Sequence, residues 1–375
     1  MRGQFGALAP VELAPGVPAT LVLDYRTAVR ILYDPERFPA DPRVWQSTVG
    51  ADCPVLPIMR WRPVASRSTA TAHVRYRQVV VATLDAVDLF DLHQTVETTA
   101  LSVIDEFSRV GTADLVSQYA FPLTFAVVNA LLGCPAEIGQ RVVHGMAALL
   151  DCERAESGYT EIIEALSELV ALKRTVPGDD IVTRMLHHSA ALDDAEIIEE
   201  VMELYGGGIE PLQNLICNAL LLMLTDERFG GGVVDGSLLT RDAIDEVLFT
   251  NPPLTNFCIS YPRQPILLGG VWLPAHQPVL ISIAACNGDP ALGRIGDYTG
   301  NRSHLAWSAG PHTCPARSVA YLTAQDAIDQ LLDVLPEISL AVTAEQLEWR
   351  PGPFHRSLRA LPVEFPPLTP TGARG

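Results

Sequence analysis

The most informative stretch of this chain is Trp307-Ser308-Ala309-Gly310-Pro311-His312-Thr313-Cys314-Pro315-Ala316. It sets one cysteine, Cys314, on a glycine-containing loop directly ahead of a segment with helical apolar spacing, and Pro315 suits the first turn of that helix. A cysteine at a helix N-terminus lies at the positive end of the helix dipole, which favours thiolate over thiol. The pattern therefore predicts a metal ligand or a nucleophile, with a buried free cysteine near a helix start as the alternative.

Composition limits the class of protein. The 375 residues are 48% hydrophobic and carry a formal charge of −18, so the chain can bury a large core, and we expect one domain over residues 1–375. No apolar run reaches the ~18 residues of a membrane span, and the N-terminus lacks a signal-peptide pattern, so we expect a soluble, cytoplasmic protein without membrane contact. The acidic excess argues against nucleic acid as a partner. Seven scattered cysteines without a CxxC pair argue against disulfides or a zinc site.

The apolar periodicity indicates a mainly α protein with a smaller β-rich region, the α+β class. Amphipathic spacing predicts helices at Thr83–Arg109, Tyr119–Leu132, Glu137–Leu150 and Thr160–Val176. Asp193 and Asp194 are expected to cap a further long helix that continues past residue 220. After Thr250 the texture changes to proline, glycine and short β runs at Ile266–Leu268, Val271–Leu273 and Pro278–Ile283.

The cysteine loop resembles the heme-binding loop of the cytochromes P450, Phe-x-x-Gly-x-x-x-Cys-x-Gly. Gly310 and Cys314 keep the spacing, whereas Trp307 stands in place of the phenylalanine and Ala316 in place of the last glycine. The resemblance implies that Cys314 is the axial ligand of iron in heme b (iron-protoporphyrin IX), with Trp307 and Gly310 shaping the cofactor loop and His312 contacting a heme propionate.

A second match lies in the pair His73 and Arg77. Residues four apart share one face of a helix, so both side chains can reach one anionic edge, although a solvated basic face has the same pattern. In the family such a pair binds the heme propionates. Weaker resemblances recur along nearly the whole chain, at residues 176–186, 251–253, 269–274, 287–290 and 349–356. The resemblance implies the cytochrome P450 fold, with heme between the long I-helix and the cysteine loop with its following L-helix.

The first departure from the family pattern is in the segment Glu246-Val247-Leu248-Phe249, where the family has Glu-x-x-Arg. A buried glutamate without its arginine would cost roughly 3–5 kcal/mol. We therefore expect either a replacement cation, Arg294 or Arg302, or partial exposure of Glu246. The chain resembles a small group of actinobacterial members that lack this arginine.

The second departure is on the long helix, Gly207-Gly208-Ile209-Glu210-Pro211, where the family has an acid followed by threonine above the iron. Pro211 has no N–H for the carbonyl of Gly207, so we expect a kink that makes room for oxygen and a water. The resemblance makes Gly207, Glu210 and Pro211 the candidate catalytic residues, with Glu210 on the proton path, and adds Gly208 to the cofactor-binding set. If the kink serves packing alone, Glu210 would face solvent or a structural partner.

The third departure is Ser260, which stands where the family usually has a propionate-binding arginine. Arg263, three residues on, is a possible substitute; otherwise the propionates would rely on His73, Arg77 and His312 alone.

These features lead to three functional hypotheses. The first is monooxygenation or oxidative tailoring of a small hydrophobic, secondary-metabolite-like substrate, with electrons from a ferredoxin and its reductase docking near Arg302, His304, His312 and Arg317. The second keeps the heme but uses peroxide, couples radicals, isomerises or dehydrates. The third is a catalytically degenerate heme-binding scaffold.

Overall fold

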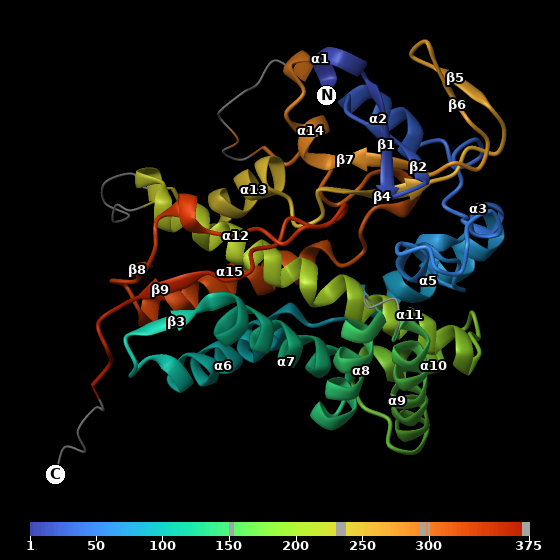
Figure 1. The fold of residues 1–375 in the computed structure, drawn as a ribbon. Coiled ribbons are helices and arrows are strands. Elements are labelled where there is room, and N and C mark those ends of the chain that lie inside the picture. Colours follow the sequence, from blue (N-terminus) through green and yellow to red (C-terminus); the bar gives the residue numbers. More distant parts are fainter. Residues whose placement is uncertain (150–153, 230–237, 293–297, 299–300, 370–375) are drawn as a thin grey trace.

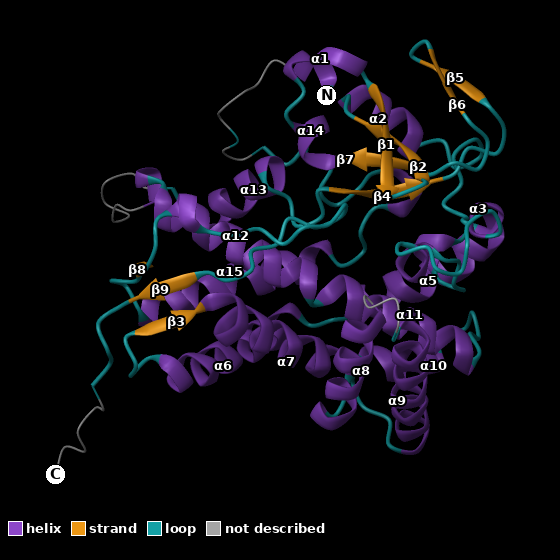
Figure 2. Ribbon diagram, in the orientation of Figure 1, coloured by secondary structure: helices purple, strands orange, loops and turns teal. Residues whose placement is uncertain are grey.

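The computed structural model describes residues 1–149, 154–229, 238–292, 298 and 301–369. Helices make up most of the molecule, and the strands gather mainly at one side of it (Figure 1; Figure 2). This arrangement confirms the predicted α+β class with a dominant helical part.

The helices follow one another along the chain. They are α1 (Arg2–Phe5), α2 (Tyr25–Leu32), α3 (Arg43–Gln46), α4 (Leu56–Met59), α5 (Ala70–Asp85), α6 (Leu89–Phe107), α7 (Phe121–Leu132), α8 (Ala136–Leu149), α9 (Ala155–Thr175), α10 (Ile181–His187), α11 (Asp194–Gly208), α12 (Glu210–Thr225), α13 (Thr240–Thr250), α14 (Ile283–Asn287) and α15 (Arg317–Val334). Three short 3-10 turns also matter for the site: η1 (Ala65–Arg67), η3 (Glu227–Phe229) and η6 (Gly310–His312).

The strands form two sheets and a hairpin. They are β1 (Leu8–Ala14), β2 (Val17–Val22), β3 (Thr112–Asp114), β4 (Asn256–Ser260), β5 (Ile266–Leu268), β6 (Val271–Leu273), β7 (Val279–Ser282), β8 (Ser339–Leu340) and β9 (Pro362–Glu364). The larger sheet has the order β1-β2-β7-β4 and contains one parallel pair, β2 with β7, which joins the N-terminal segment to the C-terminal half. The small sheet has the order β3-β9-β8, and β5 pairs with β6 in the hairpin.

The long helix α11–α12 runs through the middle of the molecule. It begins as predicted, because Asp193 and Glu196 form a reciprocal capping box at its start. The expected kink is only a local interruption: Ile209 separates the two halves, yet Asp194–Thr225 still forms one helical run. By length and composition that run could cross a membrane, as could α7 and α8 taken together, but 56% of the apolar window in Asp194–Thr225 is buried inside the molecule.

Two other boundaries differ from the sequence-based prediction. The segment Thr83–Arg109 is divided between α5 and α6, because Asp88 accepts a hydrogen bond from the backbone N–H of Phe90 and caps a new helix. The last long helix, α15, begins at Arg317, so Pro315 lies in the loop before it and outside its first turn.

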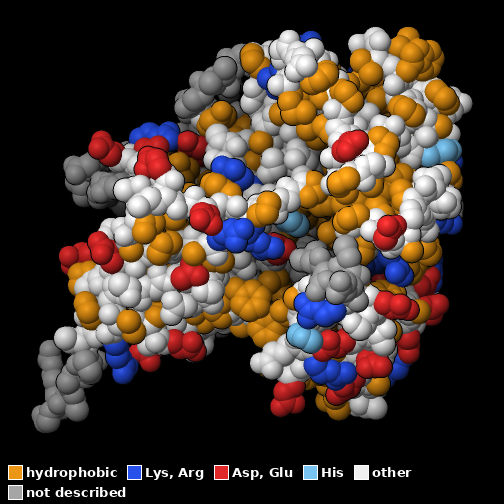
Figure 3. All heavy atoms as spheres, in the orientation of Figure 1, with side chains coloured by type: hydrophobic (Ala, Val, Ile, Leu, Met, Phe, Trp, Pro, Cys, Tyr) orange, Lys and Arg blue, Asp and Glu red, His pale blue; other side chains and the backbone are white. Residues whose placement is uncertain are grey.

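The cores follow the division between helices and strands. Two clusters of buried apolar side chains lie among the helices, around α6, α7, α12 and α15 and around α5, α8, α9 and α11. Two smaller clusters lie between the larger sheet and its flanking segments. On the face drawn in Figure 3, hydrophobic side chains gather over the β-rich part, and charged side chains of both signs cover the helical part.

Candidate functional site

A largely apolar cavity lies where the centre of α11–α12 faces the cysteine loop, with α5 and β4 contributing to its walls. It is lined by eight of the residues predicted from the sequence: His73, Arg77, Gly207, Gly208, Pro211, Trp307, His312 and Cys314. Segments that are far apart in the sequence therefore meet at one place, as the family resemblance implied. Gly310 and Glu210 are the two predicted residues that do not line this cavity.

The cysteine loop is held by its backbone. The N–H of Cys314 donates to the carbonyl oxygen of Trp307 at 2.8 Å, which closes the turn around η6. Gly310 adopts a left-handed φ of +69°, and a Cβ atom there would lie 2.3 Å from the carbonyl oxygen of Leu32 in α2. Only glycine fits this position, so Gly310 shapes the loop from behind while Cys314 faces the cavity.

Burial dominates the electrostatics of Cys314. Desolvation raises the pKa of its thiol, while the backbone N–H of Ala316 and the charges of Arg77 and Arg317 act in the opposite direction. The predicted helix-dipole effect therefore does not by itself produce a thiolate here. A bound cation such as iron would supply that stabilisation, because a metal ligand must be deprotonated.

The edge of the cavity formed by α5 and the cysteine loop is rich in cationic and donor groups. The rings of His73 and His312 lie 4.3 Å apart, and Arg77 donates to the carbonyl of Thr313 at 2.5 Å. Burial, followed by the two neighbouring basic groups, lowers the pKa of His312 to about 4. Burial and Arg77 also lower the pKa of His73, and its buried Nε2 has no hydrogen-bond partner among the described residues.

This edge fits an anionic ligand. An orphaned imidazole nitrogen and a half-buried guanidinium are both satisfied by carboxylates, and a negative group would offset the charge of Arg77 that disfavours protonation of both imidazoles. A soft thiol on the same cavity fits iron. The donor set thus suits heme, with its propionates beside His73, Arg77 and His312 and its iron on Cys314.

Part of the cavity wall comes from the interrupted helix α11–α12. Gly207, Gly208 and Pro211 line the cavity, and Pro211 leaves the carbonyl of Gly207 without its usual helical donor. Glu210 instead pairs with Arg350 at 2.8 Å, in a partly exposed position away from the cavity. The structure thus gives Glu210 the ion-pair partner that the sequence offered as the alternative, and a place for Glu210 on a proton path stays a prediction.

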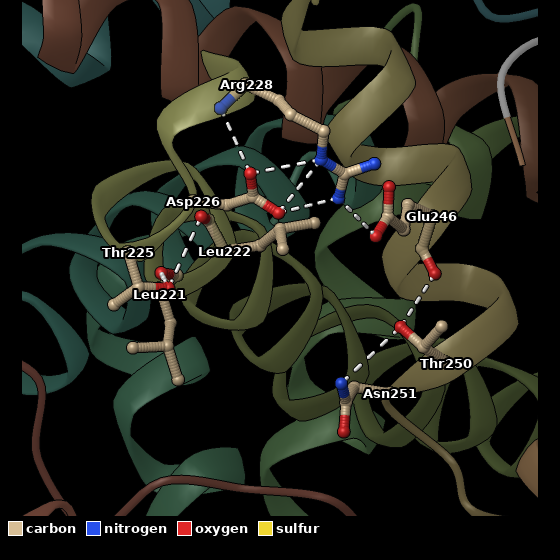
Figure 4. Close-up of polar contacts among 8 residues, drawn as sticks. All are labelled: Leu221, Leu222, Thr225, Asp226, Arg228, Glu246, Thr250 and Asn251. Carbon is tan, nitrogen blue, oxygen red and sulfur yellow. Dashed lines mark hydrogen bonds and ion pairs between the residues drawn. The ribbon is translucent and has the colours of Figure 1, made fainter. Parts of the chain in front are cut away.

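Glu246 is partly exposed, as one of the two alternatives predicted, but its cation is neither of those named. Arg228 in η3 binds the Glu246 carboxylate at 2.8 Å and holds Asp226 with the same guanidinium (Figure 4). Arg302 pairs instead with the neighbouring Asp245, at 3.3 Å. The other expected candidate, Arg294, lies outside the described residues. The replacement cation thus exists, but a residue just after α12 provides it.

An aromatic cluster occupies the space around Phe249. Its ring stacks on Tyr298 with centroids 4.8 Å apart and meets the edge of His304 at 5.2 Å. Burial, with Arg317 and Arg302 nearby, lowers the pKa of His304 to about 4, so this imidazole is neutral at pH 7. The position of the family's arginine is therefore filled by uncharged rings.

The substitute proposed for the second propionate cation is not in place. Arg263 donates to the carbonyl of Glu36 at 2.7 Å on the surface and does not line the cavity. Ser260 does line it, and its buried Oγ has no hydrogen-bond partner among the described residues.

Sequence reasoning missed a polar group of cavity residues on α11 and the segment that faces it. They are Ser66, Arg67, Glu200 and Glu203. Their only signal in the sequence was an excess of glutamates on the apolar helix before Gly207.

The chain was compared with known proteins. No protein-family model matches it. Cytochrome P450 107B1 of Saccharopolyspora erythraea is 28% identical over 301 residues, which cover 78% of this chain and 74% of that protein. The 2-hydroxy-5-methyl-1-naphthoate 7-hydroxylase of Streptomyces carzinostaticus is 26% identical over 379 residues, which cover 96% and 92%.

Solved structures agree with these relatives. CYP154C4 from Streptomyces sp. W2061 has a TM-score of 0.88 to this chain at 25% identity and covers 96% of it, with 93% of its own chain matched. Similarity of sequence and of fold thus extends over nearly all of the chain, and it comes together with a cysteine in the cofactor loop. The chain belongs to the cytochrome P450 superfamily and, as such, is an oxidoreductase whose cofactor is heme b.

Proposed function

We propose that this protein is a heme-thiolate monooxygenase that oxidises a small, mainly hydrophobic, secondary-metabolite-like molecule. The observation that carries the proposal is the convergence of Cys314, His312, His73 and Arg77 on one apolar cavity. A relative whose name records hydroxylation of an aromatic acid supports the reaction type. When bound, heme with a thiolate ligand supplies the reductive activation of dioxygen for insertion of one oxygen atom.

The residues that line the cavity have separate roles in this proposal. Cys314 holds the iron, and Ala316 donates its N–H to the sulfur, which limits how much negative charge the sulfur passes on. His73, Arg77 and His312 hold the propionates. The apolar walls exclude bulk water and bind the hydrophobic part of the substrate.

Proton supply is a step at which the chain departs from the family pattern described above. Glu210 faces Arg350, and Pro211 has no hydroxyl, so neither presents a proton donor at the cavity wall. The unpaired carbonyl of Gly207 can hold a water molecule at the cavity wall, and that water would carry the proton. The lack of an alcohol at position 211 favours, as a second candidate, heme chemistry that needs no protons delivered to iron-bound oxygen, such as isomerisation or dehydration.

The setting of the reaction completes the proposal. Electrons would come from a ferredoxin and its reductase, in a cytoplasmic protein whose 375 residues act as one domain. The docking region is the outer side of the cysteine loop, near Arg317.

A spectrum tests the proposed function directly. We expect purified protein to contain about one heme per chain and, after reduction under carbon monoxide, to show the absorption band typical of a thiolate ligand. Cys314→Ala should lose that band, whereas Cys134→Ala, a control at a buried cysteine outside the cavity, should keep it.

Stoichiometry then separates the reaction types. Product that contains one oxygen atom from O2 and forms only with reductant supports monooxygenation. Turnover without any electron donor would overturn it in favour of the second candidate, and failure to bind heme would overturn both.

A further inference from the structure

Four glutamates lie on α11, and three of them are neutralised by a cation within 4 Å. The pairs are Glu196 with Arg75, Glu199 with Arg62, and Glu203 with Arg67. Glu200 is the exception: it forms no ion pair within that distance among the described residues, although it is only 2% exposed. A buried carboxylate without a counter-ion is costly when ionised, so Glu200 either stays protonated or ionises beside a cation that comes from outside the chain.

Glu200 faces the cavity and is only partly satisfied. Its Oε1 accepts a hydrogen bond from the backbone N–H of Ala65 at 2.8 Å, and its Oε2 receives none from the described residues. Arg77 on α5, whose charge acts on Glu200, already donates to the carbonyl of Thr313. In the proposed heme site Arg77 also faces the propionates, so its charge would neutralise a propionate and not Glu200.

The remaining polar groups at this end of the cavity satisfy one another. Ser66 donates to Glu203 Oε1 at 2.6 Å, and Arg67 lies 3.8 Å from Glu203 Oε2. Glu203 and Arg67 cancel in charge, so the ionised form of Glu200 would be the uncompensated charge here. The unpartnered, buried Oγ of Ser260 elsewhere in the wall is a second vacant polar position in the same cavity.

We propose that the substrate of this cavity carries a basic amine, and that Glu200 binds the ammonium group while the apolar walls hold the rest of the molecule. This inference rests on the proposed function, because it concerns the substrate of the same site. The ammonium group supplies the fourth cation of α11. It would anchor one end of the substrate about two helical turns from Gly207, since Glu200 precedes Gly207 by seven residues.

Protonation of Glu200 couples to this binding. Burial, followed by the like charge of Glu203 and weaker repulsion from Glu196, raises the pKa of Glu200 to about 8, against the opposing effects of the Ala65 N–H and Arg77. Arg67 of η1 faces the same group of carboxylates. Without ligand, the carboxyl is therefore mostly neutral at pH 7. A cation favours its ionised form, so affinity should rise with pH up to about 8 and then level off.

The test measures calorimetric binding of three probes with one apolar body to the purified holoenzyme. They are phenylbutyltrimethylammonium, phenylbutanol and phenylpentanoate. The quaternary nitrogen has no lone pair, so it cannot ligate iron, and its charge does not depend on pH. We expect the cation to bind at least about tenfold more tightly than the alcohol or the carboxylate at pH 8. At pH 7 its binding should release about one proton, measured in buffers of different ionisation enthalpy.

Glu200→Gln should abolish the proton release and the preference for the cation, yet leave the affinity for the alcohol unchanged. Glu164→Gln, which removes the same charge from the exposed face of α9, should change neither. Preference for the alcohol would mean that Glu200 acts as a neutral hydrogen-bonding group, and preference for the carboxylate would assign the end of the cavity to Arg67; either result overturns the proposal.

Heme content and the carbon monoxide spectrum are recorded on the same preparation. A normal heme-thiolate spectrum without cation preference would defeat this inference alone, whereas missing heme would defeat the proposed function. Proton release is measured on the unmodified protein. Its absence would therefore refute the inference even if Glu200→Gln folded poorly.

Discussion

Gly310 shows how a single missing side chain positions the cofactor loop. Its backbone lies against the Leu32 carbonyl, so the loop that carries Cys314 rests on α2 of the N-terminal part. The contact is main chain against main chain, so neither side can move aside cheaply. The glycine thus fixes how far the cysteine projects into the cavity.

Replacing Gly310 should destabilise the protein more than its left-handed backbone angle alone would predict. Gly310→Ala combines a left-handed φ with a collision against backbone, and we expect a loss of about 2 kcal/mol or more in the free energy of unfolding, with reduced heme occupancy. Urea denaturation and heme content measure both effects.

A matched control is available in the hairpin. Gly270 has a similar left-handed φ of +84°, but a Cβ atom there would meet nothing within 4 Å. Gly270→Ala should cost only about 1 kcal/mol and leave heme occupancy intact. Equal losses in the two variants would show that the Leu32 contact has no energetic role.

At this scale the sequence was informative only where residues act within one motif. The spacing of Gly310, His312 and Cys314 is local, so it could be read directly, and all three lie in or behind the cavity as expected. The partner of Glu246 depends on where η3 meets α13, which no local pattern reveals. Glu200 was missed for the same reason: its lack of a partner is visible only when its three neighbours have been paired.

At the scale of elements, α13 shows how one face of a helix was rebuilt. Its glutamate turns to Arg228, and the next turn presents Phe249 to the rings of Tyr298 and His304. In the family pattern Glu-x-x-Arg, an arginine on this helix face neutralises the glutamate. In this chain, Arg228 neutralises the glutamate from outside the helix, and the ring of Phe249 packs on other rings where the arginine would stand.

Restoring the family's arginine should therefore destabilise the protein. Phe249 is 4% exposed, and Phe249→Arg would place a guanidinium among rings close to Arg302 and Arg317, while Arg228 already satisfies Glu246. We expect a loss of about 3 kcal/mol or more in unfolding free energy.

Phe249→Leu separates packing from charge. It keeps an apolar side chain and should cost about 1 kcal/mol. If Phe249→Arg were as stable as the unmodified protein in urea denaturation, the new arginine would have displaced Arg228 from Glu246, and the arrangement described for α13 would be wrong.

Element boundaries, like single residues, could be predicted only where they depend on local sequence. The capping box at Asp193 and the two strands of the β5–β6 hairpin were located correctly, because caps and short strands depend on residues that are adjacent in the sequence. The division between α5 and α6 was missed because the apolar spacing continues across Asp88. The effect of Pro211 was overestimated because it falls in the first turn of α12, where proline is tolerated.

Charge is the dominant property at the scale of the whole molecule. The chain carries −18, and the basic group expected beside the cysteine loop is weaker than its composition suggested. His304 is buried and His312 partly buried, both with pKa values lowered to about 4, and Arg302 is paired with Asp245. Arg317 is the exposed cation that remains of the predicted four.

An acidic ferredoxin should therefore be steered only weakly to this protein. We expect the second-order rate constant for its reduction of the heme to stay level or to rise when ionic strength increases from about 0.01 M to about 0.15 M, because salt screens the net repulsion. Stopped-flow reduction measures this dependence. A steep fall with salt, removed by Arg317→Gln, would instead establish an attractive docking site.

The parallel pairing of β2 with β7 and the contact of α2 with the Gly310 loop bear on when the cofactor site can form during synthesis. The segment of β2 and α2 must wait for β7 and the Gly310 loop, which are made more than 200 residues later, and closing so long a loop is slow. The helical part can collapse earlier. The cysteine therefore reaches its place only after residues 279–314 have been made, so cofactor capture must follow the pairing of these distant segments.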